Sequence, residues 1–203
     1  MHTTEFPLLA NGTLPQNHGY LLLSALSEKH PFLHGRSDLQ IAPIFGKRSE
    51  DSKELFITTR SVLRFRGLGA GEAEALQFTQ VNLQGTTLQL GQLVNVPFQG
   101  VPNLASRLVV LSGIWDPERG KMVPFVKETT VEQFTLTLAR KLNELHFEAG
   151  IQVLRKRSIL IKDRNYVGWS VRLSGLSPEE SLQIQATGIG KFTSMGCGYF
   201  VGF

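Results

Sequence analysis

The chain has 203 residues, of which 41% are hydrophobic, and its formal net charge is +4. That length and apolar content predict a globular protein with one sizeable core or two small ones. The apolar stretches are too short to span a bilayer and the N-terminus lacks a signal-peptide pattern, so we expect no membrane partner and a cytoplasmic location. Cys197 is the single cysteine, which excludes a disulfide framework and a cysteine-based zinc site.

The first half of the chain predicts strands and helices in alternation. Apolar, extended segments predict strands at 5–10, 38–45 and 54–67. A helix is predicted over 17–30, with Asn17 as its N-cap, and a short helix over 71–79. The segment "VNLQGTTLQLGQLV", residues 81–94, alternates in polarity around a glycine-centred turn.

The second half repeats this order. Residues 103–114 predict a strand, residues 130–148 an amphipathic helix, and 152–175 a hairpin that turns at Asp163–Asn165. Ser177, Pro178 and Glu180 form the pattern of a capping box at a helix start, and Gly188 ends that helix. A short strand follows at Tyr199–Val201.

Two successive β-α-β-β-α-β units predict an α+β protein with tandem ferredoxin-like domains. We place these domains at residues 1–95 and 101–203, joined near "GQLVNVPFQGVP", where glycine and proline accumulate. Such folds serve many functions, so the function must be argued from individual residues.

Basic residues are concentrated in the predicted hairpin, which contains six of them and one acidic residue, Asp163. So many like charges repel one another unless a polyanion offsets them, which favours a nucleic-acid partner over a merely solvated hairpin. The six are Arg155, Lys156, Arg157, Lys162, Arg164 and Arg172. The even spacing of Arg60, Arg64 and Arg66 predicts a second basic stripe, or equally the wet face of an amphipathic strand.

The C-terminal stretch "GIGKFTSMGCGYFVGF" follows a helix instead of preceding one, so a helix dipole does not favour phosphate there. Two interpretations remain open. The backbone amides around Gly188, Gly190, Gly196 and Gly198, together with Lys191, could approach a polyanion closely. Alternatively, the glycines only supply the positive φ angles of a tight connection.

Neither a metal-ligand pattern nor a cofactor motif is present, so we expect no metal and no cofactor. Histidines near basic residues suit a metal-independent RNA cleavage in which an acid and a base move protons. His34, in a loop beside Gly35 and Arg36, is the best-placed base. Each histidine could also be a surface residue without a catalytic role.

The segments "NHGYLLLSAL", "FLH" and "GLSPEESLQIQATGIGKFTSMGCGYF" resemble the CRISPR-associated repeat-processing endoribonucleases, the sixth Cas family of the RAMP superfamily. The resemblance covers the chain in order and is closest to the short branch associated with myxococcal-type systems. It implies two ferredoxin-like domains and metal-independent cleavage of CRISPR repeat RNA through the 2′-hydroxyl, leaving a 2′,3′-cyclic phosphate. It also implies that the protein stays on the guide RNA stem-loop as a subunit of an effector complex with other Cas subunits.

The resemblance implies His34 as general base and His18 as the alternative. The tyrosine that the family often carries in the first helix is replaced here by Ser27, which could orient the 2′-hydroxyl. Ser27 is a weak acid and Arg36 cannot give up a proton, so the general acid stays open. The glycine loop is implied to contact RNA, with Lys191 reaching phosphate.

Two other functions can be set against the sequence. The substitution at Ser27 would suit a catalytically weak RNA-holding subunit of an interference complex, or of an RNA-guided transposition complex with transposition proteins as partners. A ferredoxin-like enzyme acting on a small metabolite is disfavoured, because the sequence has no compact cofactor motif.

Overall fold

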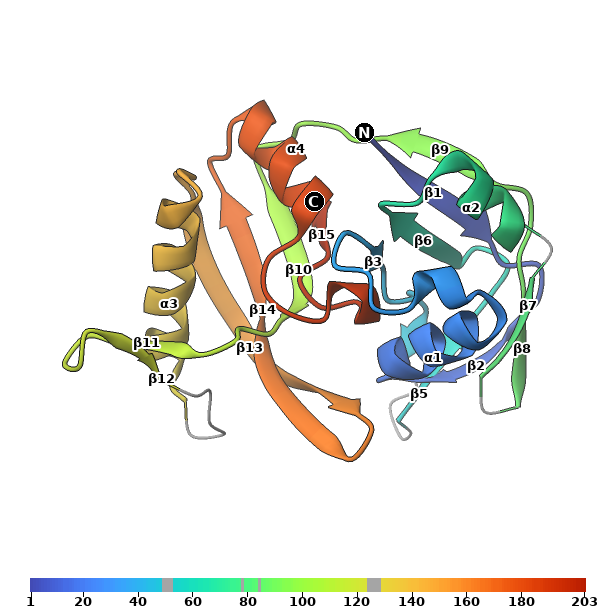
Figure 1. Ribbon diagram of the computed structural model, residues 1–203, viewed down its shortest axis with the longest axis horizontal. Coiled ribbons are helices and arrows are strands. Elements are labelled where there is room, and N and C mark those ends of the chain that lie inside the picture. Colours follow the sequence, from blue (N-terminus) through green and yellow to red (C-terminus); the bar gives the residue numbers. More distant parts are fainter. Residues whose placement is uncertain (49–52, 78, 84, 124–128) are drawn as a thin grey trace. The chain divides into compact units, whose positions relative to one another are not determined.

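Figure 1 shows the computed structural model of the chain, which describes residues 1–48, 53–77, 79–83, 85–123 and 129–203. The chain folds into two compact units. Unit 1 comprises Met1–Phe98, Leu160–Lys162 and Thr193–Gly196; unit 2 comprises Gln99–Ile159, Asp163–Phe192 and Cys197–Phe203. Within the described ranges, no helix is both long and apolar enough to cross a membrane.

The main sheet of unit 1 has four antiparallel strands in the order β3-β6-β1-β9. Along the chain they alternate with two helices as β-α-β-β-α-β, the order of a ferredoxin-like domain. These elements are β1 (His2–Pro7), α1 (Gly19–Lys29), β3 (Gln40–Ile41), β6 (Val62–Arg66), α2 (Ala70–Leu76) and β9 (Val94–Pro97). Smaller pieces complete the unit: β2 (Gly12–Pro15), η1 (Pro31–Leu33), β4 (Lys47–Arg48), β5 (Glu54–Ile57), β7 (Gln80–Leu83) and β8 (Thr86–Gln89).

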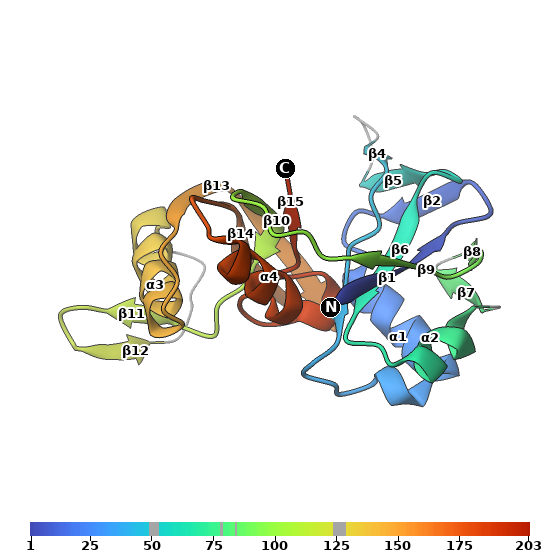
Figure 2. The same cartoon turned by 90° about the horizontal axis from the view of Figure 1, so that it is seen from above.

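The core of unit 1 lies between the helices and this sheet. In α1, Leu22, Leu23 and Leu26 are buried because their spacing places them on one helix face. They belong to the same apolar cluster as Phe6 of β1 and Phe65 of β6, whose rings meet edge to face with centroids 5.9 Å apart. Seen from above, α1 and α2 lie on one side of β1 and β6 (Figure 2).

Unit 2 repeats the topology of unit 1. Its sheet has the order β13-β14-β10-β15, and its elements again run β-α-β-β-α-β. They are β10 (Leu104–Val109), α3 (Val131–Glu144), β13 (Gly150–Ile161), β14 (Arg164–Ser174), α4 (Pro178–Thr187) and β15 (Phe200–Gly202). The hairpin of β11 (Ile114–Asp116) and β12 (Lys121–Val123) precedes α3. The short helix η2 (Thr193–Met195) lies between α4 and β15 in the chain but belongs to unit 1.

The core of unit 2 joins α3 to β14. Phe134, Leu138 and Leu142 repeat every four residues on α3, while Trp169 and Val171 alternate on β14. The rings of Phe134 and Trp169 lie 4.6 Å apart between centroids. The predicted α+β fold with tandem ferredoxin-like domains is therefore confirmed.

The capped helix α4 also forms as predicted. The Ser177 hydroxyl accepts a hydrogen bond from the Glu180 N–H at 3.2 Å, and the Glu180 carboxylate accepts one from the Ser177 N–H at 2.7 Å. Pro178 occupies the first turn, and Gly188 follows the helix with φ of 67°. Because each partner lies within a few residues, this arrangement could be read from local sequence.

Several boundaries differ from the sequence-based expectation, and three of these differences affect unit 1. The strand predicted over 54–67 is split into β5 and β6 by a turn in which the Ser61 N–H donates to the Thr58 carbonyl at 2.8 Å. The strand predicted over 38–45 shrinks to Gln40–Ile41. Helix α1 begins after His18 rather than after Asn17, and no side chain caps it.

The glycine-rich loop after α4 is packed closely against backbone. A Cβ on Gly190 would lie 2.4 Å from the Val110 carbonyl oxygen, and one on Gly198 would lie 2.1 Å from the Ile189 carbonyl oxygen. Both residues have positive φ, 100° and 61°. The glycines are therefore required by the path of the chain.

This packing predicts a graded cost for added methyl groups. Gly175→Ala should lower the free energy of unfolding by about 1–2 kcal/mol, because Gly175 has positive φ but open space around it. Gly198→Ala should cost more, because the Ile189 carbonyl must also move. Urea unfolding of both variants measures the difference, and equal losses would contradict the packing argument.

Candidate functional site

His34 lies on the surface of unit 1, directly after the short helix η1. Its backbone N–H donates to the Pro31 carbonyl at 3.0 Å, and the preceding Leu33 is fully buried in the core of unit 1. The His34 side chain is exposed, and neither ring nitrogen has a hydrogen bond to any residue that the structure describes. An imidazole held at its backbone with both nitrogens open can accept and return a proton.

His18, the alternative base, has a different environment. Its side chain is 1% exposed, its Nδ1 lies 2.8 Å from the Pro15 carbonyl oxygen, and its Nε2 accepts a hydrogen bond from the Ile44 N–H at 3.0 Å. Nδ1 therefore carries the proton and the ring is neutral. With both nitrogens occupied by backbone, His18 orders the entry to α1 and is not placed to take a proton from RNA, which corrects the expectation.

Ser27 is not placed for chemistry either. Its hydroxyl oxygen is buried in the last part of α1 and has no hydrogen-bond partner among the described residues. A hidden hydroxyl cannot orient a 2′-hydroxyl of RNA in this conformation.

His30, at the end of α1, has a hydrogen-bond partner: its Nε2 lies 2.8 Å from the Thr79 hydroxyl oxygen. Burial lowers the pKa of His30, and the charge of Lys29 lowers it further.

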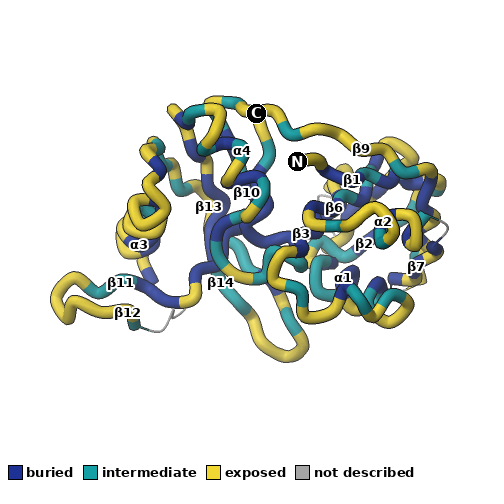
Figure 3. Tube along the Cα trace, turned by 45° about the horizontal axis from the view of Figure 1, so that its top comes forward, coloured by how far each residue is buried: buried dark blue, intermediate teal, exposed yellow. Residues whose placement is uncertain are grey.

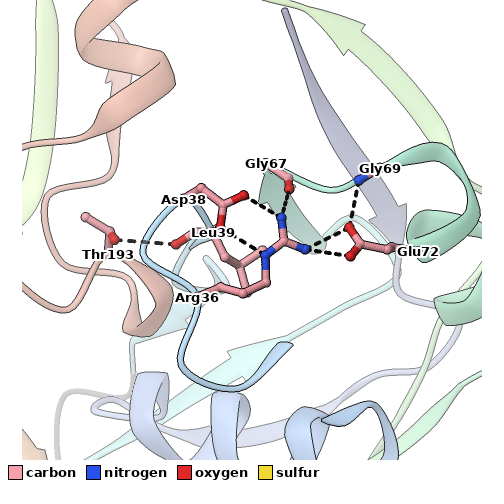
Figure 4. A network of polar contacts seen from close by, with 7 residues as sticks. All are labelled: Arg36, Asp38, Leu39, Gly67, Gly69, Glu72 and Thr193. Atoms are coloured by element: carbon pink, nitrogen blue, oxygen red, sulfur yellow. Dashed lines mark hydrogen bonds and ion pairs between the residues drawn. The ribbon is translucent and has the colours of Figure 1, made fainter. Parts of the chain in front are cut away.

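Arg36, two residues after His34, donates hydrogen bonds from all three of its guanidinium nitrogens (Figure 4). Its Nη1 donates to both carboxylate oxygens of Glu72 at 2.8 and 2.7 Å, and its Nε and Nη2 donate to Asp38 at 3.0 and 2.6 Å. Nη2 also donates to the Gly67 carbonyl. Two carboxylates thus offset its charge, so Arg36 fixes the loop and is not a free cation beside His34.

The pKa values of both acids reflect this network. Hydrogen bonds from Arg36 lower the pKa of Asp38. The hydrogen bond from the Gly69 N–H lowers the pKa of Glu72 most, and the hydrogen bonds from Arg36 lower it further. By accepting from the Gly69 N–H, the Glu72 carboxylate also caps α2. No pattern in the sequence indicated this network, because Arg36 and Glu72 are 36 residues apart.

The predicted stripe of Arg60, Arg64 and Arg66 does not form. Arg60 lies in the turn between β5 and β6, where it is exposed. Arg64 pairs with Glu5 at 2.6 Å. Arg66 is 4% exposed, donates to the Thr3 hydroxyl at 3.3 Å and lies 4.9 Å from the centre of the Phe98 ring. Only Arg60 of the three keeps an exposed side chain without an ion pair in the described ranges.

The basic hairpin forms as β13 and β14, which run for 12 and 11 residues, and its end is exposed (Figure 3). Consecutive strand residues point to opposite faces, so Arg155 and Arg157 lie on one face and Lys156 on the other. Arg155 is exposed, whereas Arg157 is half-buried. Lys156 Nζ lies 5.1 Å from the centre of the Trp169 ring and 3.4 Å from the Thr129 carbonyl oxygen.

The glycine loop offers fewer open amides than the sequence suggested. The N–H groups of Gly188, Gly196 and Gly198 donate to the carbonyls of Ile184, Thr193 and Leu108. The Lys191 N–H donates to the Val110 carbonyl at 2.8 Å, but its side chain is exposed and forms no ion pair in the described ranges. Of the loop's predicted phosphate contacts, the Gly190 N–H and the Lys191 side chain remain without a partner in the described ranges.

Comparison with known proteins places this chain in a family. The family model described as "Cas6 Crispr" matches residues 4–203. A curated relative from Myxococcus xanthus strain DK1622, named CRISPR-associated endonuclease Cas6, is 32% identical over 198 residues, which are 97% of this chain and 79% of the relative. The chain belongs to the Cas6 family. The resemblance inferred from the sequence motifs is thereby confirmed.

Solved structures share the fold of this chain. One, titled "An RAMP protein binding different RNA substrates", matches with a TM-score of 0.71 at 14% identity and covers 100% of both chains. Thermus thermophilus Cse3 bound to an RNA representing a pre-cleavage complex matches with a TM-score of 0.55 at 16% identity, covering 98% of this chain and 97% of that one. In the part of this Cas6-family chain that the structure describes, no three His, Cys, Asp or Glu residues gather as a metal site.

The Arg36 network predicts a pH-dependent contribution to stability. Arg36→Ala should lower the free energy of unfolding by about 1–2 kcal/mol at pH 7, a value reduced by solvent because Asp38 is 64% exposed. Both carboxyl pKa values are lowered by folding, so this contribution is present above about pH 4 and is lost as pH falls through the folded-state values.

Urea unfolding of wild type and Arg36→Ala at pH 7 and at about pH 3 tests this, with the gap expected to narrow at low pH. Arg48→Ala is a matched control, because Arg48 bonds the neutral Gln16. A gap for Arg36→Ala that is the same at both pH values would contradict the role of the two carboxylates.

Proposed function

We propose that this chain is an endoribonuclease that cuts the repeat RNA of a CRISPR transcript, with His34 as the general base and without a metal ion. The observation that carries the proposal is the exposed imidazole of His34, with open ring nitrogens, on a loop fixed by buried Leu33 and paired Arg36. Membership of the Cas6 family, whose curated relative is named an endonuclease, supports the enzyme class.

The reaction that suits one imidazole base is an internal transesterification. His34 takes the proton of the 2′-hydroxyl, and the 2′-oxygen attacks the adjacent phosphorus. The bond from phosphorus to the 5′-oxygen breaks, and an acid returns a proton to that oxygen. The products are a 2′,3′-cyclic phosphate and a 5′-hydroxyl, so no water is consumed and no metal-bound nucleophile is required.

The hairpin of β13 and β14 is the proposed holder of the repeat stem. Arg155 and Arg164 are exposed along it and have no ion pair in the described ranges, so their charges are available to phosphates. Contacts to an RNA duplex through phosphates depend on shape more than on sequence. Cutting one bond beside the stem leaves these contacts in place, so the protein stays on its product as a subunit of an effector complex.

Replacing His34 tests the catalytic part of the proposal. His34→Ala should reduce cleavage of a labelled repeat RNA by at least about a hundredfold, because general-base catalysis contributes that much or more. Affinity for the RNA should stay within about twofold, because the substitution removes no phosphate contact. Incubation in EDTA and analysis of the product ends measure the rate, the metal requirement and the cyclic phosphate together.

Two further histidine variants serve as controls. His146→Asn should cleave as wild type, because His146 is exposed in unit 2 and Asn tolerates its positive φ. His18→Ala should lower thermal stability, because it leaves the Ile44 N–H without its acceptor. Unchanged cleavage by His34→Ala would remove His34 from the mechanism, and tight binding by wild type without any cut would favour an RNA-holding subunit.

The hairpin predicts unequal salt effects from neighbouring cations. Arg155→Ala should reduce the slope of log affinity against log salt by about 0.7–0.9, as expected for one lost phosphate contact. Lys156→Ala should reduce it less, because the Lys156 ammonium is directed toward Trp169 and Thr129. Filter binding of the repeat RNA over a salt series gives both slopes, and an equal or larger effect of Lys156→Ala would contradict this arrangement.

A further inference from the structure

A pocket within unit 2 gathers cations around an aromatic ring and has no part in the proposed cleavage. Its volume is about 240 Å³, and it lies between the β11–β12 hairpin, α3 and the start of the glycine loop. The residues that matter to its chemistry are Ser112, Trp115, Met122, Arg140, Lys141 and Lys191. All of them belong to unit 2.

Trp115 and Arg140 form a stacked pair at this pocket. The Arg140 guanidinium lies 3.6 Å from the centre of the Trp115 ring, and its Nε donates to Glu144 at 3.0 Å. The backbone N–H of Trp115 donates to the Thr137 hydroxyl at 2.8 Å, which joins β11 to α3. Both side chains also border a second hollow of about 430 Å³. The pair is therefore held in place while remaining accessible, as a stacking surface must be.

The charge of the pocket favours an anion. Arg140, Lys141 and Lys191 contribute three positive charges and Glu144 one negative charge, a formal net of +2. Lys141 and Lys191 have no ion pair with any residue in the described part of the chain. Their charges are therefore not offset by protein, in contrast to that of Arg140.

The glycine loop places Lys191 at this pocket. The Lys191 N–H donates to the Val110 carbonyl, and the absent side chain of Gly190 lets the loop approach the same carbonyl closely. Any Cβ at residue 190 would lie 2.4 Å from that oxygen. The tight packing of the loop thus fixes the backbone from which the lysine extends.

We propose that this pocket binds one nucleotide of a single-stranded RNA segment, with the base against Trp115 and Arg140 and a phosphate near Lys141 and Lys191. An aromatic ring combined with basic groups is the usual basis of single-strand binding. The volume lies below the usual 300–1,000 Å³ of metabolite sites, which favours one unstacked base over a larger ligand. The proposal rests on the proposed function, because it takes RNA as the partner.

Tryptophan fluorescence of the full-length protein tests this directly. The chain has two tryptophans, and Trp169 is only 3% exposed, so quenching by added RNA reports on Trp115. The probe is a short oligouridine, which has no stem and needs no repeat recognition. Wild type should be quenched, and Trp115→Ala should bind the probe about 5- to 100-fold more weakly by fluorescence anisotropy.

Further variants separate stacking from charge and from misfolding. Trp115→Phe should retain most of the affinity, because a phenyl ring still stacks. Lys191→Ala should reduce the slope of log affinity against log salt by about 0.7. Lys121→Ala should leave this slope unchanged, because Lys121 lies on the β11–β12 hairpin but outside the pocket. Absence of quenching, or equal effects of Lys191→Ala and Lys121→Ala, would overturn the proposal.

Parallel cleavage assays distinguish the two proposals. A wild-type protein that cuts repeat RNA but shows no quenching with oligouridine would retain the proposed function and lose the nucleotide pocket. A protein that is quenched by oligouridine but cuts no repeat RNA would retain the pocket and lose the cleavage mechanism.

Discussion

The ion pairs of Arg36 with Asp38 and Glu72 are the interaction on which the position of the His34 loop depends. On one side of His34, Leu33 is fixed by burial in the core of unit 1; on the other, the planar guanidinium joins the loop to the first turn of α2. Only His34 and Gly35 lie between these two anchors. A bidentate pair fixes direction as well as distance, so the network orients the loop even where solvent weakens its energy.

The two units share one topology but expose different parts of it. In unit 1, the loop after the first helix carries the exposed histidine. In unit 2, the second and third strands are extended to 12 and 11 residues, while β10 and β15 have 6 and 3. Strand residues beyond the reach of their sheet neighbours and helices have no core to enter, so their side chains face solvent. The same topology therefore carries an exposed imidazole in one copy and a basic hairpin in the other.

The features that the sequence predicted well are those whose partners are close in the chain. The α4 cap, the glycine-centred turn between β7 and β8, and the apolar face of α3 all depend on residues within one or two turns. The order of these elements was sufficient for the tandem fold. The prediction of one strand over 54–67 was wrong, because the strand-like pattern continues through a turn. This turn is formed by the hydrogen bond from the Ser61 N–H to the Thr58 carbonyl.

The candidate site was predicted less completely, because sequence gives the charges but not their partners. Arg64 pairs with Glu5, 59 residues away, and Arg66 contacts Thr3, 63 residues away. Burial of His18 between two backbone groups was equally invisible, since Ile44 lies 26 residues further on. A histidine at the start of a helix looks reactive until the elements packed around it are known.

The structure also separates the basic residues by chemical type. Arg36, Arg64 and Arg140 are each engaged by carboxylates, which the flat, forked guanidinium matches in geometry. Lys141 and Lys191 keep their charges unpaired within the described residues. Because these arginines are paired with carboxylates, the net charge of +4 does not show which cations remain unpaired. Cations without an ion pair in the described residues include Arg155 and Arg164 on the hairpin of unit 2, and Lys141 and Lys191 at the pocket beside Trp115.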